Sequence, residues 1–131
     1  MTSIDGVALK GWSVAMGITI VHSSSEEVVG EIDIGEIHQQ SFGIVHGGVY
    51  CGLIETLGSI GAYLAAKERG HSGVAGLENT TSFVRAVSSG RIRGVAKPIA
   101  KGTSTQLWEV VVCDDQGRVV SLGRVRLLCL H

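Results

Sequence analysis

The stretch HGGVYCGLIETLGSIGAYLAA, residues 46–66, is apolar and rich in glycine, and the fold depends on it. Its larger apolar side chains recur at spacings of three and four residues, which is typical of a helix with one buried face: Val49, Leu53, Leu57, Ile60 and Leu64. Lys67 and Arg69 suit the negative end of a helix dipole, and Gly70 suits a C-terminal cap. The spacing therefore predicts one helix of about twenty residues that ends near residues 67–70.

Glu55 is the only formally charged side chain between Glu36 and Lys67. The segment from residue 47 to residue 66 is long enough to span a membrane. An acidic residue near the centre of a membrane span costs about 2.5 to 3.5 kcal/mol on insertion scales, and the flanking chain has the patterns of strands. These observations favour a buried helix over a membrane helix.

Strand patterns lie on both sides of this helix. Residues 17–36 are typical of two strands joined by a polar turn at Ser23–Glu27. Four further strand patterns follow the helix, at residues 73–87, 90–102, 105–114 and 118–130. The sequence DDQG, Asp114–Gly117, predicts a hairpin between the last two. We therefore expect one domain over residues 1–131, of class α+β, in which an antiparallel sheet of about six strands wraps one long central helix.

Composition excludes several classes of protein. A chain of 131 residues with 44% hydrophobic and 18% charged residues is globular, and its net charge of −1 gives no global attraction to nucleic acid or to anionic lipid. Only 5% of the residues are aromatic, so a base-stacking surface is not expected. The three cysteines are widely spaced, which indicates neither a disulfide framework nor a metal site. The N-terminal stretch lacks the pattern of a secretion signal, so we expect a cytoplasmic protein.

Glu55 is the first candidate for chemistry. Its helical neighbours at three and four residues are all small: Cys51, Gly52, Gly58 and Ser59. Such a face lets a ligand or another backbone come close to a partly desolvated carboxylate. The alternative is a structural carboxylate that is satisfied by hydrogen bonds at a subunit contact.

The helix start, His46-Gly47-Gly48, is the second candidate. The first N–H groups of a helix lack internal partners and lie at its positive end, so they suit an oxyanion or a thioester carbonyl. The alternative is a glycine turn that serves only backbone geometry. Cys51 and His46 could also be considered as a nucleophile pair, but they need not face each other across the loop-to-helix junction, and a buried cysteine is favoured.

A local excess of positive charge is the third candidate. Between Glu78 and Glu109 there are basic residues and no acidic one: Arg85, Arg91, Arg93, Lys97 and Lys101. The last four share one face of a predicted strand, and a basic face suits phosphate groups. The alternative is an ordinary solvated strand face.

Taken together, the pattern HQQSFGIVHGGVYCGLIETLGS, residues 38–59, resembles the hotdog-fold acyl-CoA thioesterases. The branch concerned includes the 4-hydroxybenzoyl-CoA, phenylacetic-acid-degradation and 1,4-dihydroxy-2-naphthoyl-CoA thioesterases. Its members carry a loop glutamine, a histidine-glycine-glycine, an acid nine residues after the histidine, and a serine or threonine four residues after the acid. This sequence matches that pattern without a gap, at Gln40, His46, Gly47, Gly48, Glu55 and Ser59.

The resemblance implies an enzyme that hydrolyses an acyl-CoA thioester, with an aromatic or medium-chain acyl group. It assigns the Gly47 N–H to polarise the thioester carbonyl and Gln40 to orient the thioester or the water. Glu55 would attack the carbonyl or activate a water, and Ser59 would hold the carboxylate or the water, with His46 beside them. The resemblance further implies a site built across a homodimer, a homotetramer of two such dimers, and no metal or cofactor beyond the CoA of the substrate.

The resemblance also suggests contacts to CoA at Gly48, Ser82, Arg85, Lys101, Gly102 and Thr103, whereas Arg91 and Arg93 rest on charge alone. Two other hotdog branches fit less well. One needs an aspartate in the loop before the helix, and the only nearby aspartate is Asp33, on a predicted strand. The hydratase branch needs an aspartate and a histidine around a proline, and the sole proline is Pro98. A non-catalytic acyl-CoA-binding protein of the same fold is the alternative function.

Overall fold

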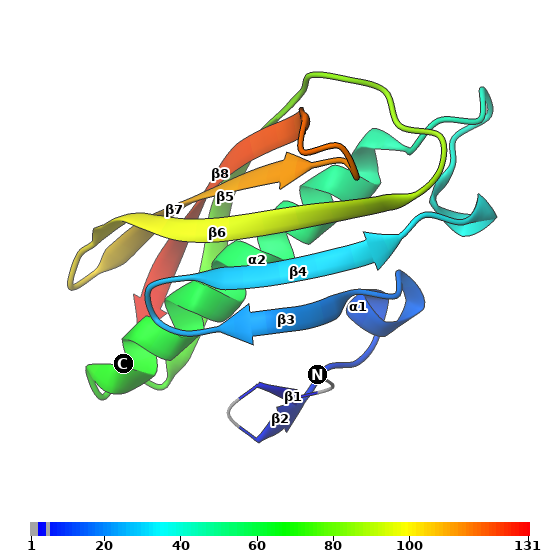
Figure 1. The fold of residues 1–131 in the computed structure, drawn as a ribbon. Helices are drawn as coiled ribbons and strands as arrows, with labels where there is room; N and C mark the ends of the chain where they lie inside the picture. The colour runs from blue at the N-terminus through cyan, green and yellow to red at the C-terminus, as the bar shows by residue number, and fades with distance from the viewer. Residues whose placement is uncertain (1–2, 5) are drawn as a thin grey trace.

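A computed structural model describes residues 3–4 and 6–131, and its centre is one long helix against a curved antiparallel sheet (Figure 1). The helix is α2 (Gly47–Glu68). The six strands of the sheet are β3 (Thr19–Ser23), β4 (Val28–Asp33), β5 (Gly73–Phe83), β6 (Arg91–Lys101), β7 (Thr105–Cys113) and β8 (Val119–Leu130). They lie in the order β3-β4-β6-β7-β8-β5, with every pair antiparallel. The predicted α+β architecture is confirmed.

The N-terminal elements were not expected from the sequence. Strands β1 (Ser3–Ile4) and β2 (Val7–Ala8) pair in a separate two-stranded sheet, and the short helix α1 (Trp12–Ala15) follows them. A short 3-10 helix, η1 (Glu36–His38), begins the loop before α2. Strands of two residues and a single helical turn are too short to show a hydrophobic period, so no pattern could have predicted them.

Helix α2 begins and ends close to the predicted positions. His46 is its N-cap, and the Nδ1 atom of His46 accepts a hydrogen bond of 2.8 Å from the Gly48 N–H. Gly70, with a φ of +81°, follows the last turn in the left-handed conformation that glycine favours. α2 is long and apolar enough to cross a membrane, but 56% of its most apolar 18-residue stretch is buried inside the protein. α2 is thus the core helix.

Leu57 brings α2 close to the sheet. Strands β4 and β6 pair Gly30 with Gly94 directly opposite each other. A Cβ atom at Gly30 would lie 2.6 Å from Leu57 Cδ2, and one at Gly94 would lie 2.7 Å from Leu57 Cδ1. The fully buried Leu57 side chain therefore fills the space that these two glycines leave open, and this contact fixes the face that α2 turns to the sheet.

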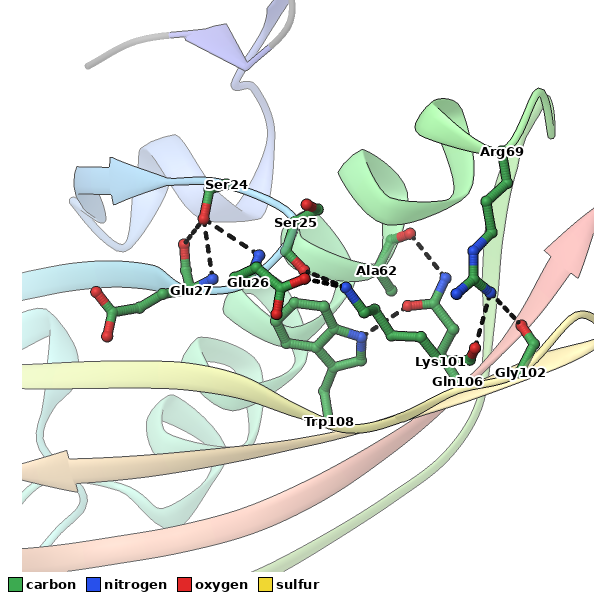
Figure 2. A network of polar contacts seen from close by, with 10 residues as sticks. All are labelled: Ser24, Ser25, Glu26, Glu27, Ala62, Arg69, Lys101, Gly102, Gln106 and Trp108. Carbon is green, nitrogen blue, oxygen red and sulfur yellow. Dashed lines mark hydrogen bonds and ion pairs between the residues drawn. The ribbon is translucent and has the colours of Figure 1, made fainter.

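Trp108 of β7 packs beside the second half of α2 (Figure 2). The indole is fully buried, and its Nε1–H donates to Gln106 Oε1 at 2.8 Å. The Gln106 amide in turn donates to the Ala62 carbonyl at 3.1 Å. A Cβ atom at Gly61 would lie only 2.4 Å from the indole ring, so this helix glycine makes room for a core side chain.

Candidate active site

Glu55 lies in the middle of α2 and faces β5, the strand at one edge of the sheet. Ser59 Oγ–H donates to Glu55 Oε2 at 3.1 Å, as expected for residues four positions apart on a helix. Asn79 Nδ2–H of β5 donates to Glu55 Oε1 at 3.2 Å. The partly exposed carboxylate is therefore held by two neutral donors, one on each oxygen.

Asn79 is a site residue that the sequence reasoning missed. Strict alternation along β5 would place Gly76 and Asn79 on opposite faces. The pairing of β5 with β8 shifts between Gly76 and Glu78, which inserts one extra residue, Leu77. Gly76 and Asn79 thus both face Glu55, and a Cβ atom at Gly76 would lie 2.9 Å from Glu55 Oε2. A bulge of this kind leaves no hydrophobic signature in the sequence.

The small-residue face around Glu55 is narrower than predicted. Gly52 lies on it, but it is covered by the Trp12 ring, because a Cβ atom at Gly52 would lie 2.1 Å from Trp12 Cη2. Gly58 does not lie on it: this residue is buried against the sheet, and a Cβ atom there would lie 3.3 Å from Val125 Cγ2. The inclusion of Gly58 in the reactive face was therefore wrong, because the sheet curves around that side of the helix.

The helix start separates the roles of Gly47 and Gly48. The Gly48 N–H is engaged by the His46 ring at 2.8 Å, and the Val49 N–H donates to the His46 carbonyl at 2.9 Å. The Gly47 N–H makes no hydrogen bond to any residue that the structure describes. Because Nδ1 of His46 accepts a hydrogen bond, the neutral ring carries its proton on Nε2. Gly47 is thus the N–H at this helix start that is open to an incoming acceptor.

Gln40 lies in a tight loop beside the helix start. Its N–H donates to the Ile44 carbonyl at 2.8 Å, and its side-chain carbonyl accepts from the Phe42 N–H. The side-chain NH2 group makes no hydrogen bond to a described residue, so it can donate to a ligand. Gln40, Gly47 and Arg85 line one cavity of about 360 Å³, so the structure brings these three predicted residues together.

Tyr50 and Phe83 line the same cavity and were not predicted. The Phe83 ring lies on Gly47, where a Cβ atom would be 2.8 Å from Phe83 Cζ. Tyr50 is buried, and its hydroxyl has no hydrogen-bond partner among the described residues. Burial raises the pKa of Tyr50, and the negative charge of Asp114 raises that pKa further. These two rings make the wall beside the Gly47 N–H largely apolar.

A second cavity, of about 290 Å³, begins at Ser59, one helical turn beyond Glu55. It lies between the N-terminal hairpin, α2 and β5, and its remaining lining residues are Ile4, Val7, Ala8, Leu9, Ile60, Tyr63 and Val74. Apart from Ser59 and the Tyr63 hydroxyl, these side chains are hydrocarbon. The cavity therefore suits an apolar group rather than a charged one.

Glu55 and Gly47 are not brought together within one chain. They are eight residues apart on the same helix. At 1.5 Å of rise per residue their separation along the axis is about 12 Å. One thioester carbon cannot lie within reach of both groups in the same chain.

The predicted basic face of β6 is matched by acidic side chains on β4 and in the turn before it. Arg91 pairs with Asp33 at 2.7 Å, and Arg93 pairs with Glu31 at 2.8 Å. Lys97 lies 3.7 Å from Glu27, and Lys101 pairs with Glu26. The charge argument for phosphate binding at Arg91 and Arg93 therefore loses its basis. Arg85, by contrast, makes no ion pair with a described residue.

The turn between β6 and β7 lies at the opposite end of α2 from Gly47. Arg69, just beyond the last turn of α2, donates to the carbonyls of Lys101 and Gly102 at 2.7 and 3.0 Å (Figure 2). Thr103 is exposed in this turn. Within one chain, the predicted CoA contacts at Lys101, Gly102 and Thr103 are therefore separated from Arg85 and the cavity at Gly47.

Ser82, a predicted CoA contact, lies on the outer surface of β5. Ser82 is exposed on β5, and its carbonyl accepts a hydrogen bond of 2.8 Å from Ser121 Oγ. Among the residues that the structure describes, no three His, Cys, Asp or Glu side chains are grouped as metal ligands would be.

Residues 42–121, which include Gly47, Glu55 and Ser59, match the Thioesterase superfamily. The chain is 37% identical to the proofreading thioesterase EntH of Cronobacter sakazakii over 110 residues, 84% of this chain and 79% of that protein. It is 32% identical to the 1,4-dihydroxy-2-naphthoyl-CoA hydrolase of Escherichia coli K12, with the same coverage of both chains.

Solved structures agree with these relatives. The structure of Rv1847 from Mycobacterium tuberculosis superposes with a TM-score of 0.89, at 37% identity, over 92% of this chain and 96% of that chain. A thioesterase from Haemophilus influenzae superposes with a TM-score of 0.85, at 27% identity, over 91% and 82%. The hotdog fold and the predicted class of thioester hydrolase are thereby confirmed, and the chain belongs to the thioesterase superfamily.

Proposed function

We propose that this protein hydrolyses an acyl-CoA thioester to the free acid and CoA, with Glu55 as its reactive group. The observation that carries the proposal is the placement of Glu55. This partly exposed carboxylate is held by two neutral donors, and the Ser59 that binds it also lines an apolar cavity. A carboxylate without a cationic partner keeps its negative charge available for an electrophilic carbon or for the proton of a water.

Two routes lead to the same products. In the first, Glu55 takes a proton from water, and the water oxygen adds to the thioester carbon. The carbon–sulfur bond then breaks, and the proton on Glu55 passes to the leaving thiolate to give the CoA thiol. In the second, Glu55 itself adds to the carbon and expels the thiolate, and water then hydrolyses the mixed anhydride. In both routes the carbonyl oxygen gains negative charge, which the Gly47 N–H would stabilise at the positive end of α2.

The proposed site needs a second copy of the chain, because Glu55 and Gly47 lie about 12 Å apart along one helix. Strand β5, which carries Asn79 beside Glu55, pairs with β8, and among the described residues no strand pairs with its other edge. An open edge of eleven residues can pair with another strand. We therefore propose a homodimer in which Glu55 of one subunit faces the helix start of the other. A tetramer of two such dimers stays a prediction from the family resemblance.

We further propose that the cavity beside Ser59 holds an aromatic or medium-chain acyl group. Its volume of about 290 Å³ and its hydrocarbon lining suit such a group. The name of the Escherichia coli relative, a 1,4-dihydroxy-2-naphthoyl-CoA hydrolase, supports an aromatic acyl group. Arg85, at the cavity with Gly47 and Gln40, is the CoA contact that the geometry favours. The proposal involves no metal or further cofactor, and a cytoplasmic location stays a prediction.

A thiol-release assay over aryl-CoA, acyl-CoA of increasing length and acyl-carrier-protein substrates tests the proposal. We expect hydrolysis of at least one aryl- or medium-chain CoA ester, and we expect Glu55→Gln to lower kcat by about 100-fold or more. Glu68→Gln, the same substitution near the end of the same helix, is the matched control and should leave kcat unchanged. Full activity in Glu55→Gln would contradict the assignment of Glu55. Acyl-CoA binding without thiol release would favour the non-catalytic alternative.

A further inference from the structure

We propose that Asn79, oriented by Thr81, is a positioning residue that holds the Glu55 carboxylate in its reactive direction. The inference rests on the proposed function of Glu55 and adds a role that the sequence pattern does not contain. Neither Asn79 nor Thr81 is among the site residues that the family resemblance assigns.

The amide of Asn79 has a defined orientation. Thr81 Oγ1–H donates to Asn79 Oδ1 at 2.7 Å, the shortest side-chain contact in this group. Since Oδ1 is engaged on the strand side, the NH2 group of the amide points to the helix. Thr81 lies two residues along the same strand, so its side chain is on the same face as Asn79.

The two hydrogens of that NH2 group have separate acceptors. One bond goes to the Cys51 carbonyl at 3.1 Å, and the other goes to Glu55 Oε1 at 3.2 Å. The Cys51 carbonyl belongs to the backbone of α2, one turn before Glu55, so its position does not depend on any rotamer. Asn79 is thus anchored to the helix backbone and donates to Glu55 from a fixed point.

The second oxygen of Glu55 is restrained from the other side. Ser59 Oγ–H donates to Oε2 at 3.1 Å, and the missing side chain of Gly76 leaves room for that oxygen. With one donor on each oxygen, the carboxylate plane is fixed between β5 and the next turn of α2. Reacting atoms must lie about 3 to 3.5 Å apart, and an error of about 1 Å costs roughly 100-fold in rate. The orientation of this carboxylate therefore affects turnover directly.

Four variants and one control variant of the purified protein test the role of Asn79. Asn79→Ala removes the donor, and Asn79→Asp keeps the shape while it replaces the donor with a second negative charge. Thr81→Val removes only the hydroxyl that orients the amide, whereas Thr81→Ser restores it. Thr80→Val alters the side chain between them on the opposite face of β5 and is the matched control. The readouts are kcat and KM in the thiol-release assay, with thermal unfolding of each variant.

We expect Asn79→Ala to lower kcat by about 10- to 100-fold with KM within about twofold of wild type, and Asn79→Asp to lower it further, because like charges repel. Thr81→Val should lower kcat by about 3- to 10-fold, as the amide then loses one restraint. Thr81→Ser and Thr80→Val should match wild type, and the midpoint of unfolding should stay the same throughout.

Three results would overturn the inference: a kcat for Asn79→Ala within twofold of wild type, a rise in KM in place of the fall in kcat, or equal losses in Thr81→Val and Thr81→Ser. The activity of Glu55→Gln shows whether only the positioning role of Asn79 is wrong or whether the proposed function of Glu55 is wrong as well. If Glu55→Gln is inactive while Asn79→Ala is fully active, only the positioning role is wrong. If Glu55→Gln is fully active, the proposed function of Glu55 fails, and the positioning role fails with it.

Discussion

Helix α2 carries two glycines that are each covered by a tryptophan ring, and the two contacts differ in character. At Gly61 a Cβ atom would lie 2.4 Å from the Trp108 ring, and at Gly52 it would lie 2.1 Å from the Trp12 ring. Trp108 is fully buried and hydrogen-bonded to Gln106. Trp12 is 43% exposed and sits on α1, a helix of four residues without a side-chain cap.

The same residue type therefore has two uses on one helix. Gly61 lets a large core side chain pack against the helix backbone, which serves stability. Gly52 lies three residues before Glu55, and the ring that covers it, Trp12, is partly in solvent. A glycine-rich helix in a sequence is thus not evidence of a ligand site until the side chain that covers each glycine is known.

The largest expected difference is in the free energy of unfolding when each tryptophan is replaced by alanine. Trp108→Ala should lower the free energy of unfolding by about 3 to 5 kcal/mol, because it leaves a cavity in the core and removes the partner of Gln106. Trp12→Ala should cost at most about half as much, since the indole is already partly in water. Urea denaturation of both variants measures the difference. Equal losses would show that α1 is as much part of the core as β7 is.

Replacement of each glycine by alanine tests the same comparison, with smaller expected changes in the free energy of unfolding. Gly61→Ala should lower the free energy of unfolding by about 1 to 2 kcal/mol, because overpacking against Trp108 outweighs the gain of about 1 kcal/mol in helix propensity. Gly52→Ala should be neutral or stabilising, because the Trp12 ring can move into solvent. The fluorescence of Trp12 in a Trp108→Phe background should then shift to the red. A stability loss in Gly52→Ala as large as in Gly61→Ala would contradict the distinction.

The smallest expected effect concerns the wall of the site that β5 supplies. Gly76→Ala would place a Cβ atom 2.9 Å from Glu55 Oε2, and the flexible end of the glutamate side chain would move. We expect kcat to fall by about 10-fold with no change in the free energy of unfolding. Gly73→Ala, on the same strand with open space around it, is the control. A loss of activity in both variants would assign the effect to β5 as a whole and not to the carboxylate.

The fold was largely predictable from the sequence because its long elements have clear periods. The helical spacing from Val49 to Leu64 gave α2 to within a few residues, and the alternation around Glu31 and Asp33 gave β4. Glu55 is a candidate from the sequence because a single charge in an apolar helix is costly to retain. The resemblance implied that Ser59 holds the carboxylate or the water, and Ser59 Oγ–H does donate to Glu55.

What could not be predicted depends on contacts between distant segments. The pairing of Arg93 with Glu31 follows from the register of β6 against β4, which no local pattern encodes. Asn79 reaches Glu55 only because β5 contains a bulge. The cover of Gly52 by Trp12 requires the position of a four-residue helix. In each case the sequence shows the residue but not its partner.

The contact of Leu57 with Gly30 and Gly94 has a consequence for how related sequences can diverge. A side chain at either glycine would collide with Leu57, since the nearest atoms would lie at 2.6 and 2.7 Å. A larger residue at 30 or 94 can therefore be accepted only together with a smaller one at 57. These three positions should vary jointly among relatives although about 27 or more residues separate 57 from each of the others. Because Glu55 is two residues from Leu57, this joint variation would also preserve the direction in which the carboxylate points.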